Sequence, residues 1–308
     1  MSLPMKKNSL LHWIACLRFC LVFVVLVGTG NAKPARSEGV RTVHLPILSK
    51  NFYPGPGTVT GKVINSSTGT PVGSQSSPAA LVCFDGTLCD YTDAEGYYSI
   101  SGIPAGPQVL TASGDGFHSS KQTAWVLGYH TASLNFALTP YITGESIVLR
   151  IILTWDDTKN WINPSPPFDS RPNDLDAHLW LDATTPAHIY SGERGDCTIY
   201  PNACLEVDYQ YGFGPETIAV RKTENGNYFF GVLNYYQGYP GVPPISRTAA
   251  QVEIFDENGL VQAFQVPSSG DGDFWYVFSM VPAGEDKVLI TPTNCITNYG
   301  SGTLPSCP

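Results

Sequence analysis

The sequence predicts an all-β protein with two β-sandwich domains in tandem, and three observations carry this prediction. The chain of 308 residues contains 30 Gly and 25 Pro, which interrupt helices, and only 14% charged residues to form helix-stabilising pairs. No stretch sustains an apolar period of 3.6 residues. Short segments that alternate apolar and polar residues recur instead, bounded by Gly, Pro, Asn or Asp, as in strands buried on one face.

The overall charge narrows the classes of partner. The chain is 43% hydrophobic, which argues against a disordered protein, and its 26 acidic and 17 basic residues give a net charge of -9. A surface of this sign repels phosphate backbones and anionic lipid, so we expect no nucleic-acid partner. Cations such as calcium are more plausible partners.

Residues 1–32 have the pattern of a signal peptide. Lys6 and Lys7 precede an apolar run of nine residues, FCLVFVVLV, and small residues end the segment at Ala32. The run is short of the ~20 residues that span a bilayer. We therefore expect cleavage after Ala32, an extracellular or cell-surface protein, and no stable membrane span. The Pro-containing residues 33–56 then read as a linker.

Six cysteines follow the leader, and an even number in an exported chain indicates disulfides. Six cysteines allow 15 connectivities, but short loops with turn residues separate neighbours, which favours local bridges. A zinc site would need closely spaced Cys pairs, which are absent. The expected pairs are Cys83/Cys89, Cys197/Cys204 and Cys295/Cys307.

The first predicted sandwich covers residues 57–141. Its expected strands are Thr58–Ile64, Ala79–Cys83, Tyr97–Ile100, Gln108–Ala112 and Ser133–Leu138. The motifs GTVTG at 57–61, TDAEGYY at 92–98 and IPAG at 103–106 resemble the carboxypeptidase regulatory-like domain, a transthyretin-like sandwich. That resemblance implies an accessory module without catalytic residues, often found in cell-surface proteins.

The second predicted sandwich covers residues 145–294, and residues 295–308 form a tail that a disulfide could close. Its expected strands are Ser146–Trp155, Leu175–Leu181, His188–Ser191, Thr217–Arg221, Asn227–Leu233, Ala250–Phe255 and Phe274–Val281, and a hairpin is expected at Ile254–Val261. The motifs LTW at 153–155, DLDAHL at 174–179 and YGFGPETI at 211–218 loosely resemble an uncharacterised extracellular β-domain of bacteria. This resemblance implies a fold but no activity.

The sequence contains none of the usual signatures of a hydrolase. It has no Gly-x-Ser-x-Gly elbow, no His-Glu-x-x-His motif and no phosphate-binding Gly-Lys-Ser/Thr loop. No His is followed three residues later by Glu, so the carboxypeptidase zinc motif is also absent. Paired carboxylates remain, because glycoside hydrolysis needs only two acids at a fixed distance.

The DLDAH segment is the candidate metal site. Alternation along a strand places Asp174, Asp176 and His178 on one face and the intervening apolar residues on the other. Oxygen donors crowded in this way suit calcium, with Asp208 or Glu216 as further ligands. His178 with His188 would instead favour zinc. In the alternative interpretation the two Asp side chains accept backbone N–H bonds, and His178 faces solvent.

Aromatic residues give the candidate ligand-binding surface. The segment NYYQGYPG at 234–241 places Tyr235, Tyr236 and Tyr239 in a loop, and Trp161 lies in a Pro- and Asp-rich segment. Exposed aromatic rings stack on sugars or anchor protein interfaces. Trp155 and Trp180 are expected to be packing residues.

We therefore predict a secreted or cell-surface binding or structural protein without catalysis, which contacts polysaccharide or an envelope protein through its second domain. The alternative is a secreted hydrolase that uses Asp174, Asp176 and Asp208 with a metal ion or as an acid/base pair.

Overall fold

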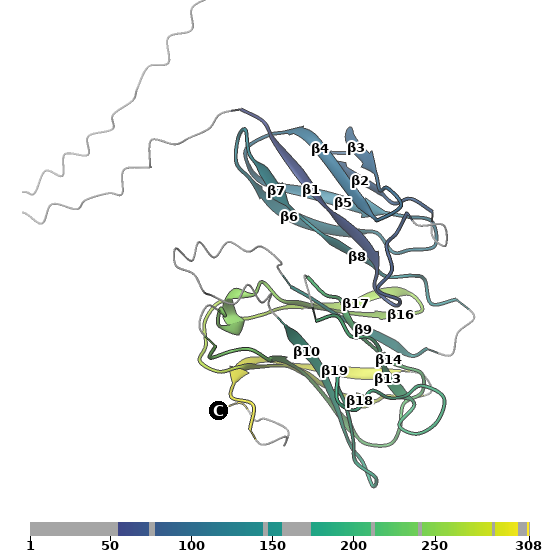
Figure 1. Ribbon diagram of the computed structural model, residues 1–308. Coiled ribbons are helices and arrows are strands. Elements are labelled where there is room, and N and C mark those ends of the chain that lie inside the picture. Colours follow the sequence, from purple (N-terminus) through teal and green to yellow (C-terminus); the bar gives the residue numbers. More distant parts are fainter. Residues whose placement is uncertain are drawn as a thin grey trace, which may run out of the picture. The chain divides into compact units, whose positions relative to one another are not determined.

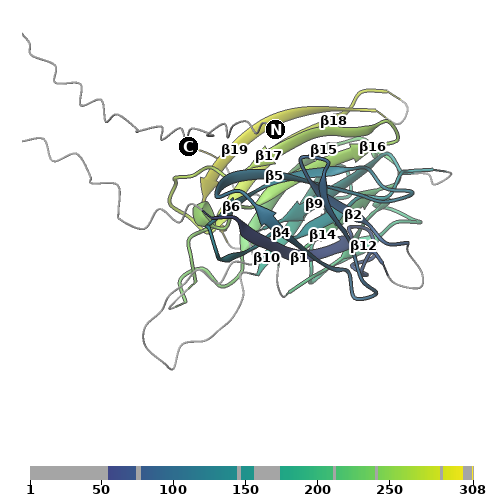
Figure 2. The same cartoon turned by 90° about the horizontal axis from the view of Figure 1, so that it is seen from above.

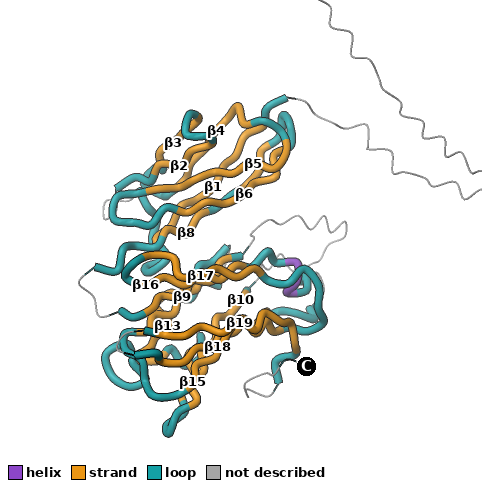
Figure 3. The backbone as a smooth tube through the Cα atoms, turned by 180° about the vertical axis from the view of Figure 1, so that it is seen from behind, coloured by secondary structure: helices purple, strands orange, loops and turns teal. Residues whose placement is uncertain are grey.

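The computed structural model describes residues 55–73, 78–143, 147–155, 174–210, 213–239, 242–284, 287–300 and 307. The predicted signal peptide, most of the linker and Trp161 lie outside these residues. The described part is built almost entirely from strands, as predicted, with one 3-10 turn at Ile245–Arg247 (Figure 3). Within it, no helix combines the length and the apolar character needed to cross a membrane.

Strands β1 to β8 form the first sandwich (Figure 1). One sheet has the order β4-β1-β7, with β8 also paired to β1, and the facing sheet has the order β3-β2-β5-β6. Val59, Ile103, Leu110 and Phe136 are fully buried between the two sheets. The strands are β1 (Gly57–Asn65), β2 (Leu81–Phe84), β3 (Leu88–Tyr91), β4 (Tyr97–Ile103), β5 (Gly106–Ser113), β6 (Ser120–Val126), β7 (Thr131–Ser133) and β8 (Phe136–Leu138).

The motif at residues 92–98 forms the turn into β4. Asp93 Oδ1 accepts the backbone N–H groups of Glu95 at 3.0 Å and Tyr97 at 2.8 Å, which closes an Asx-type turn. Gly96 follows with φ +84°, and a Cβ there would lie 2.6 Å from Val63 O. The turn therefore requires glycine at this position both for its dihedral angle and for space.

The predicted strand Ser133–Leu138 is wrong as a single element. β7 and β8 pair separately with β1, opposite residues 58–60 and 63–65. Between them, Asn135 Oδ1 accepts the backbone N–H of Lys62 at 2.8 Å. A side chain thus takes the place of one backbone partner, and the strand is interrupted there.

Strands β9 to β19 form the second sandwich, whose sheets have the orders β11-β10-β15-β18-β19 and β12-β13-β14-β9-β16-β17. Ile151, Leu153, Phe230 and Trp275 are buried in its core. Figure 2 shows β18 and β19 side by side. The strands are β9 (Leu149–Thr154), β10 (Leu175–Asp182), β11 (Ala187–Ile189), β12 (Gly195–Asp196), β13 (Ala203–Val207), β14 (Glu216–Val220), β15 (Asn227–Asn234), β16 (Gln251–Asp256), β17 (Gly259–Gln265), β18 (Phe274–Pro282) and β19 (Val288–Thr297).

The hairpin and the three local disulfides are confirmed. β16 and β17 pair antiparallel, and Gly259 adopts φ +121° in the turn between them. Disulfides join Cys83 to Cys89, Cys197 to Cys204 and Cys295 to Cys307. Both sandwiches belong to one compact unit, Lys50–Pro308, and Thr217 Oγ1 donates a hydrogen bond to Ser66 O at 2.6 Å.

Candidate functional site

The first candidate region is an acidic cluster of Asp174, Asp176, Asp208 and Glu216. Asp174 precedes β10, Asp176 lies on it, Asp208 follows β13, and Glu216 begins β14 in the opposite sheet. Asp174, Asp176 and Glu216 are 6%, 5% and 0% exposed. Glu216 Oε2 accepts the backbone N–H of Ala177 at 2.6 Å, which ties β14 to β10.

Burial and repulsion between neighbouring charges make Asp174, Asp176 and Glu216 resist ionisation. Burial, with smaller contributions from the charges of Asp176 and Asp208, raises the pKa of Asp174 to about 7. Burial raises the pKa of Asp176 to about 6, although a hydrogen bond with Ser191 opposes this shift. Burial and the charge of Asp176 hold the pKa of Glu216 well above its ordinary value.

Among the described residues, three carboxylate oxygens of this cluster are buried without a hydrogen-bond partner. They are Asp174 Oδ1, Asp208 Oδ1 and Glu216 Oε1. The other oxygen of Asp208 accepts a hydrogen bond from Arg194 Nη1 at 3.1 Å. Across the described ranges, no group of three His, Cys, Asp or Glu side chains is already arranged to hold a metal ion. The metal site expected at Asp174, Asp176, His178 and Asp208 therefore stays a prediction.

The second region is a stack of four rings on β10 and its neighbour, formed by His178, Trp180, His188 and Tyr190. The ring centroids of Trp180 and His188 are 4.3 Å apart, and those of His188 and Tyr190 are 4.4 Å apart. His178 Nδ1 lies 2.9 Å from His188 Nε2, so one imidazole donates to the other. The alternative in which His178 faces solvent is wrong, because the side chain is 2% exposed.

Both imidazoles are held in the neutral form. Burial, together with the proximity of His188, lowers the pKa of His178 to about 3. Burial lowers the pKa of His188 to about 4. Two neutral imidazoles can share one hydrogen bond, whereas two imidazolium ions at this distance would repel each other.

The predicted tyrosine loop lies at the surface. Tyr235 and Tyr239 are each 59% exposed, and Tyr236 is half-buried between them. The centroids of Tyr235 and Tyr236 are 4.9 Å apart in an edge-to-face arrangement. Trp161, the other predicted ligand-binding residue, lies outside the described residues, so its position relative to this loop is not defined.

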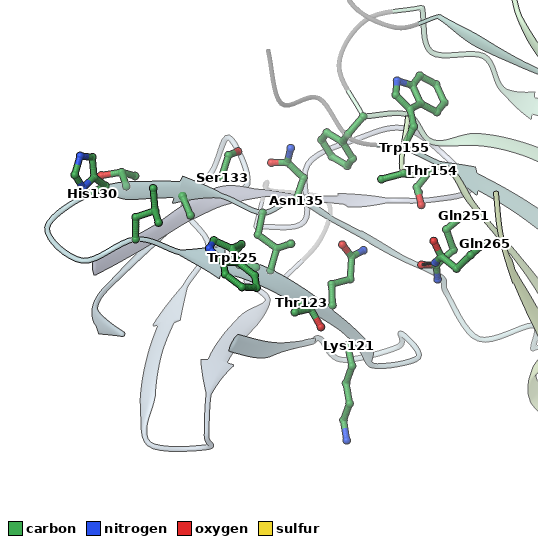
Figure 4. A pocket seen from close by; sticks show the side chains of 18 residues that line it. Lys121, Thr123, Trp125, His130, Ser133, Asn135, Thr154, Trp155, Gln251 and Gln265 are labelled. Atoms are coloured by element: carbon green, nitrogen blue, oxygen red, sulfur yellow. Dashed lines mark hydrogen bonds between the residues drawn. The ribbon is translucent and has the colours of Figure 1, made fainter. Parts of the chain in front are cut away.

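The third region is a groove of about 950 Å³ along β6 and β7 of the first sandwich and β9, β16 and β17 of the second. Figure 4 shows the Trp125 ring in the groove between His130 and the Gln251–Gln265 pair. Trp125 is 69% exposed, and Trp155 is buried beside the groove as a packing residue. Gln265 Nε2 donates to Gln251 Oε1 at 2.6 Å.

The lining of this groove is polar but nearly uncharged. Its hydroxyl groups come from Thr123, Thr131, Ser133 and Thr154, and its amides from Gln122, Asn135, Gln251 and Gln265. Among the described residues, its titratable side chains are Lys121 and His130, and none of its lining residues is a carboxylate. Such a surface can exchange hydrogen bonds with a ligand rich in hydroxyl groups while an aromatic ring packs against its apolar face.

Trp125 was missed as a candidate by the sequence reasoning, although a signal was present. In the segment SKQTAWV at 120–126, Ala124 and Val126 point inward and are buried. Alternation therefore places Trp125 outward. The segment has few apolar residues, which is why it was not predicted as a strand.

A family model for the carboxypeptidase regulatory-like domain matches residues 58–139. The match confirms the resemblance noted for residues 57–141 and does not extend to the second sandwich. A search of curated proteins found no match.

Solved structures give weak likenesses. A protein of unknown function is 16% identical with a TM-score of 0.35, covering 48% of this chain and 89% of that one. A protein from Bacteroides uniformis, described as a candidate for carbohydrate binding, is 14% identical with a TM-score of 0.23, covering 69% and 99%. A DUF3823 family protein from Bacteroides ovatus is 15% identical with a TM-score of 0.21, covering 70% and 100%. With TM-scores this low, none of the three assigns a function.

Proposed function

We propose that this protein is a non-catalytic binding protein that holds a neutral polysaccharide in the groove around Trp125, outside the cytoplasm. The observation that carries the proposal is the exposed Trp125 ring in a groove whose other polar groups are mainly hydroxyls and amides. The volume of about 950 Å³ lies at the upper end of ordinary ligand sites.

The chemistry of the lining favours a neutral sugar chain over other ligands. An acidic polysaccharide would find Lys121 and His130 but no guanidinium group among the described lining residues of the groove. An apolar ligand would leave the amides of Gln122 and Asn135 without hydrogen-bonding water, which costs free energy. A sugar has hydroxyl groups for these amides and a C–H face for Trp125.

Burial of the acids supports binding without catalysis. A hydrolase that used Asp174 or Asp176 would need its substrate to reach side chains that are 6% and 5% exposed. The described lining of the groove offers no pair of carboxylates for acid/base chemistry. For the alternative hydrolase, substrate could not reach the buried Asp174 and Asp176. The groove that a substrate could reach has no carboxylate among its described lining residues.

The disulfides support a location outside the cytoplasm. The structure joins all six cysteines that follow the predicted leader, and such bonds persist in oxidising compartments. The signal peptide predicted at residues 1–32 is the sequence feature that would deliver the chain there.

Binding to insoluble or gel-immobilised cellulose, mannan and starch, with polygalacturonate as the acidic comparison, tests this proposal. We expect retention on at least one neutral polymer and a loss of roughly 30-fold in affinity for Trp125→Ala, as for an aromatic residue that dominates a binding surface. No retention on any of the neutral polymers, or retention on polygalacturonate alone, would contradict the proposal.

Tyr91→Ala is the matched control, because Tyr91 is 64% exposed on the same sandwich and does not line the groove. A double change, Tyr235→Ala/Tyr239→Ala, tests the tyrosine loop. We expect both variants to bind as the unmodified chain does. If the double change abolishes binding and Trp125→Ala does not, the tyrosine loop is the site and the groove is not.

A further inference from the structure

The acidic cluster has an unusual arrangement of charge for the interior of a sandwich. Its four carboxyl groups come from three separate segments, and the repulsion between them is felt at Asp174, Asp176 and Glu216. Its ion pair within the described chain is the contact of Asp208 with Arg194, whose side chain is 48% exposed. One half-exposed guanidinium group does not neutralise four carboxylates.

Within the described part of the chain, three buried oxygens of the acidic cluster have neither a hydrogen bond nor a cation to offset the cost of their burial. Glu216 is fully buried on β14, its Oε2 is fixed by Ala177 N–H, and its Oε1 has no partner. Asp174 Oδ1 and Asp208 Oδ1 are also buried without a partner. A buried carboxylate oxygen without a hydrogen bond or a cation is costly, so these three atoms call for a ligand of positive charge.

We propose that Asp174, Asp208 and Glu216 bind one divalent cation with a preference for oxygen ligands, and that this cation is calcium. Calcium accepts six to eight oxygens in irregular geometry and so tolerates ligands from separate segments, including backbone carbonyls. Asp176 contributes its charge, while its hydrogen bond with Ser191 holds it in place.

The three proposed ligands differ in how firmly the fold holds them. Asp174 and Asp208 lie outside regular strands, just before β10 and just after β13, so their side chains can turn toward a cation. Glu216 is held by its strand and provides the fixed ligand. Among the described side chains, no group of three His, Cys, Asp or Glu is arranged to hold a metal ion, so the proposal requires Asp174 and Asp208 to move toward Glu216 on binding.

His178 is engaged outside the three proposed ligands through one of its two ring nitrogens, and its Nε2 is buried without a partner among the described residues. Its Nδ1 is occupied by His188 at 2.9 Å, and its ring stacks between Trp180 and Tyr190 with centroids 5.3 and 5.2 Å away. A donor set made of carboxylate oxygens favours calcium, whereas imidazole and thiolate ligands are typical of zinc.

The test uses the full chain after export, treated with chelator and dialysed, then titrated with CaCl2, MgCl2 or ZnCl2. Isothermal titration measures binding, and thermal unfolding measures stabilisation. We expect saturable calcium binding and a rise in Tm of roughly 5 to 10 °C at 100 times the dissociation constant. Absence of calcium binding in the unmodified chain would overturn the proposal.

Glu216→Gln keeps the shape and an acceptor for Ala177 N–H, and we expect it to weaken calcium binding at least tenfold. If this variant does not fold, Asp208→Asn provides the same test at a loop position. Glu257→Gln is the matched control, because Glu257 is exposed in the β16–β17 turn. Equal calcium affinity in all three variants would also overturn the proposal. Polysaccharide binding by the Trp125 groove is measured in a separate experiment, so the calcium site and the polysaccharide site can each be contradicted without the other.

Discussion

The outer face of one sheet is open in the first sandwich and covered in the second, although both faces carry large aromatic side chains. On the β3-β2-β5-β6 sheet, Tyr91 and Trp125 are 64% and 69% exposed. On the β10 side of the second sandwich, Trp180 is 8% exposed and packs with Phe274 and Tyr299. The comparison teaches that alternation along a strand decides which residues share a face, whereas segments distant in sequence decide whether solvent reaches it.

The largest expected effect comes from removing a buried ring of the covered face. Phe274→Ala should reduce the free energy of unfolding by about 3 to 5 kcal/mol, because Phe274 is fully buried against His178, Trp180 and Tyr299. Trp125→Ala on the open face should change it by less than about 0.5 kcal/mol. Urea denaturation measures the free energy of unfolding of both variants, and equal losses in the two would contradict the expected difference between the covered and the open face.

A smaller effect is expected from opening the disulfide beside the covered face. Cys295 and Cys307 pack against the Trp180, Phe274 and Tyr276 cluster. Replacing both cysteines with Ala should cost about 3 kcal/mol and make the fluorescence of Trp180 more solvent-like. Cys83→Ala/Cys89→Ala is the comparison on the open face, and it should cost about 2 kcal/mol with no change at Trp180. Identical spectra for the two variants would show that the tail does not cover the face.

The smallest effect concerns pH. Unfolded His188 gains a proton near its ordinary pKa of 6.5, while the folded chain keeps it neutral down to about pH 4. At His188 the unfolded state therefore binds more protons in this range, so the contribution of this imidazole to stability falls as pH decreases from 6.5 toward 4. Asp174 and Asp176, whose pKa values are raised, contribute with the opposite sign, so the effect is seen as the difference between the variant and the unmodified chain. His188→Phe retains a ring beside Trp180 and should flatten this part of the profile.

Thermal unfolding between pH 7 and pH 4.5 measures the pH effect, with His130→Phe as the control. The exposed His130 lies on the open sandwich, with Nδ1 2.7 Å from Gly128 O. A profile for His188→Phe that matches the unmodified chain would mean that the imidazole pair does not set the acid limit of stability.

The sequence predicted the sheets where apolar residues alternate strongly. β9, β10 and β15 have one or both faces filled with Leu, Ile, Val and Phe, so period and composition agree. The missed strands β3, β6 and β19 lie at sheet edges, and their outward residues are largely exposed. An edge strand buries little, so its sequence carries little hydrophobic signal. The strand β13 was also missed, although it lies between β12 and β14.

The sequence predicted which residues of the candidate site share one face of a strand, but not which residues of other strands contact them. Alternation correctly placed Asp176 and His178 on the face opposite Leu175 and Ala177. Nothing local showed that Glu216, 40 residues downstream of Asp176 in the chain, would cap Ala177 N–H from the other sheet. Burial of the acids depends on such long-range contacts, so it could not be read from the motif.

The spacing of the disulfides bears on how the chain matures. The bonded cysteines are 6, 7 and 12 residues apart, and the three pairs follow one another along the chain without interleaving. When the chain emerges with its N-terminus first, both cysteines of one pair are available before the cysteines of the next pair appear. Stepwise oxidation in order of synthesis therefore leads to the native set directly, and a disulfide isomerase has no wrong pair to correct.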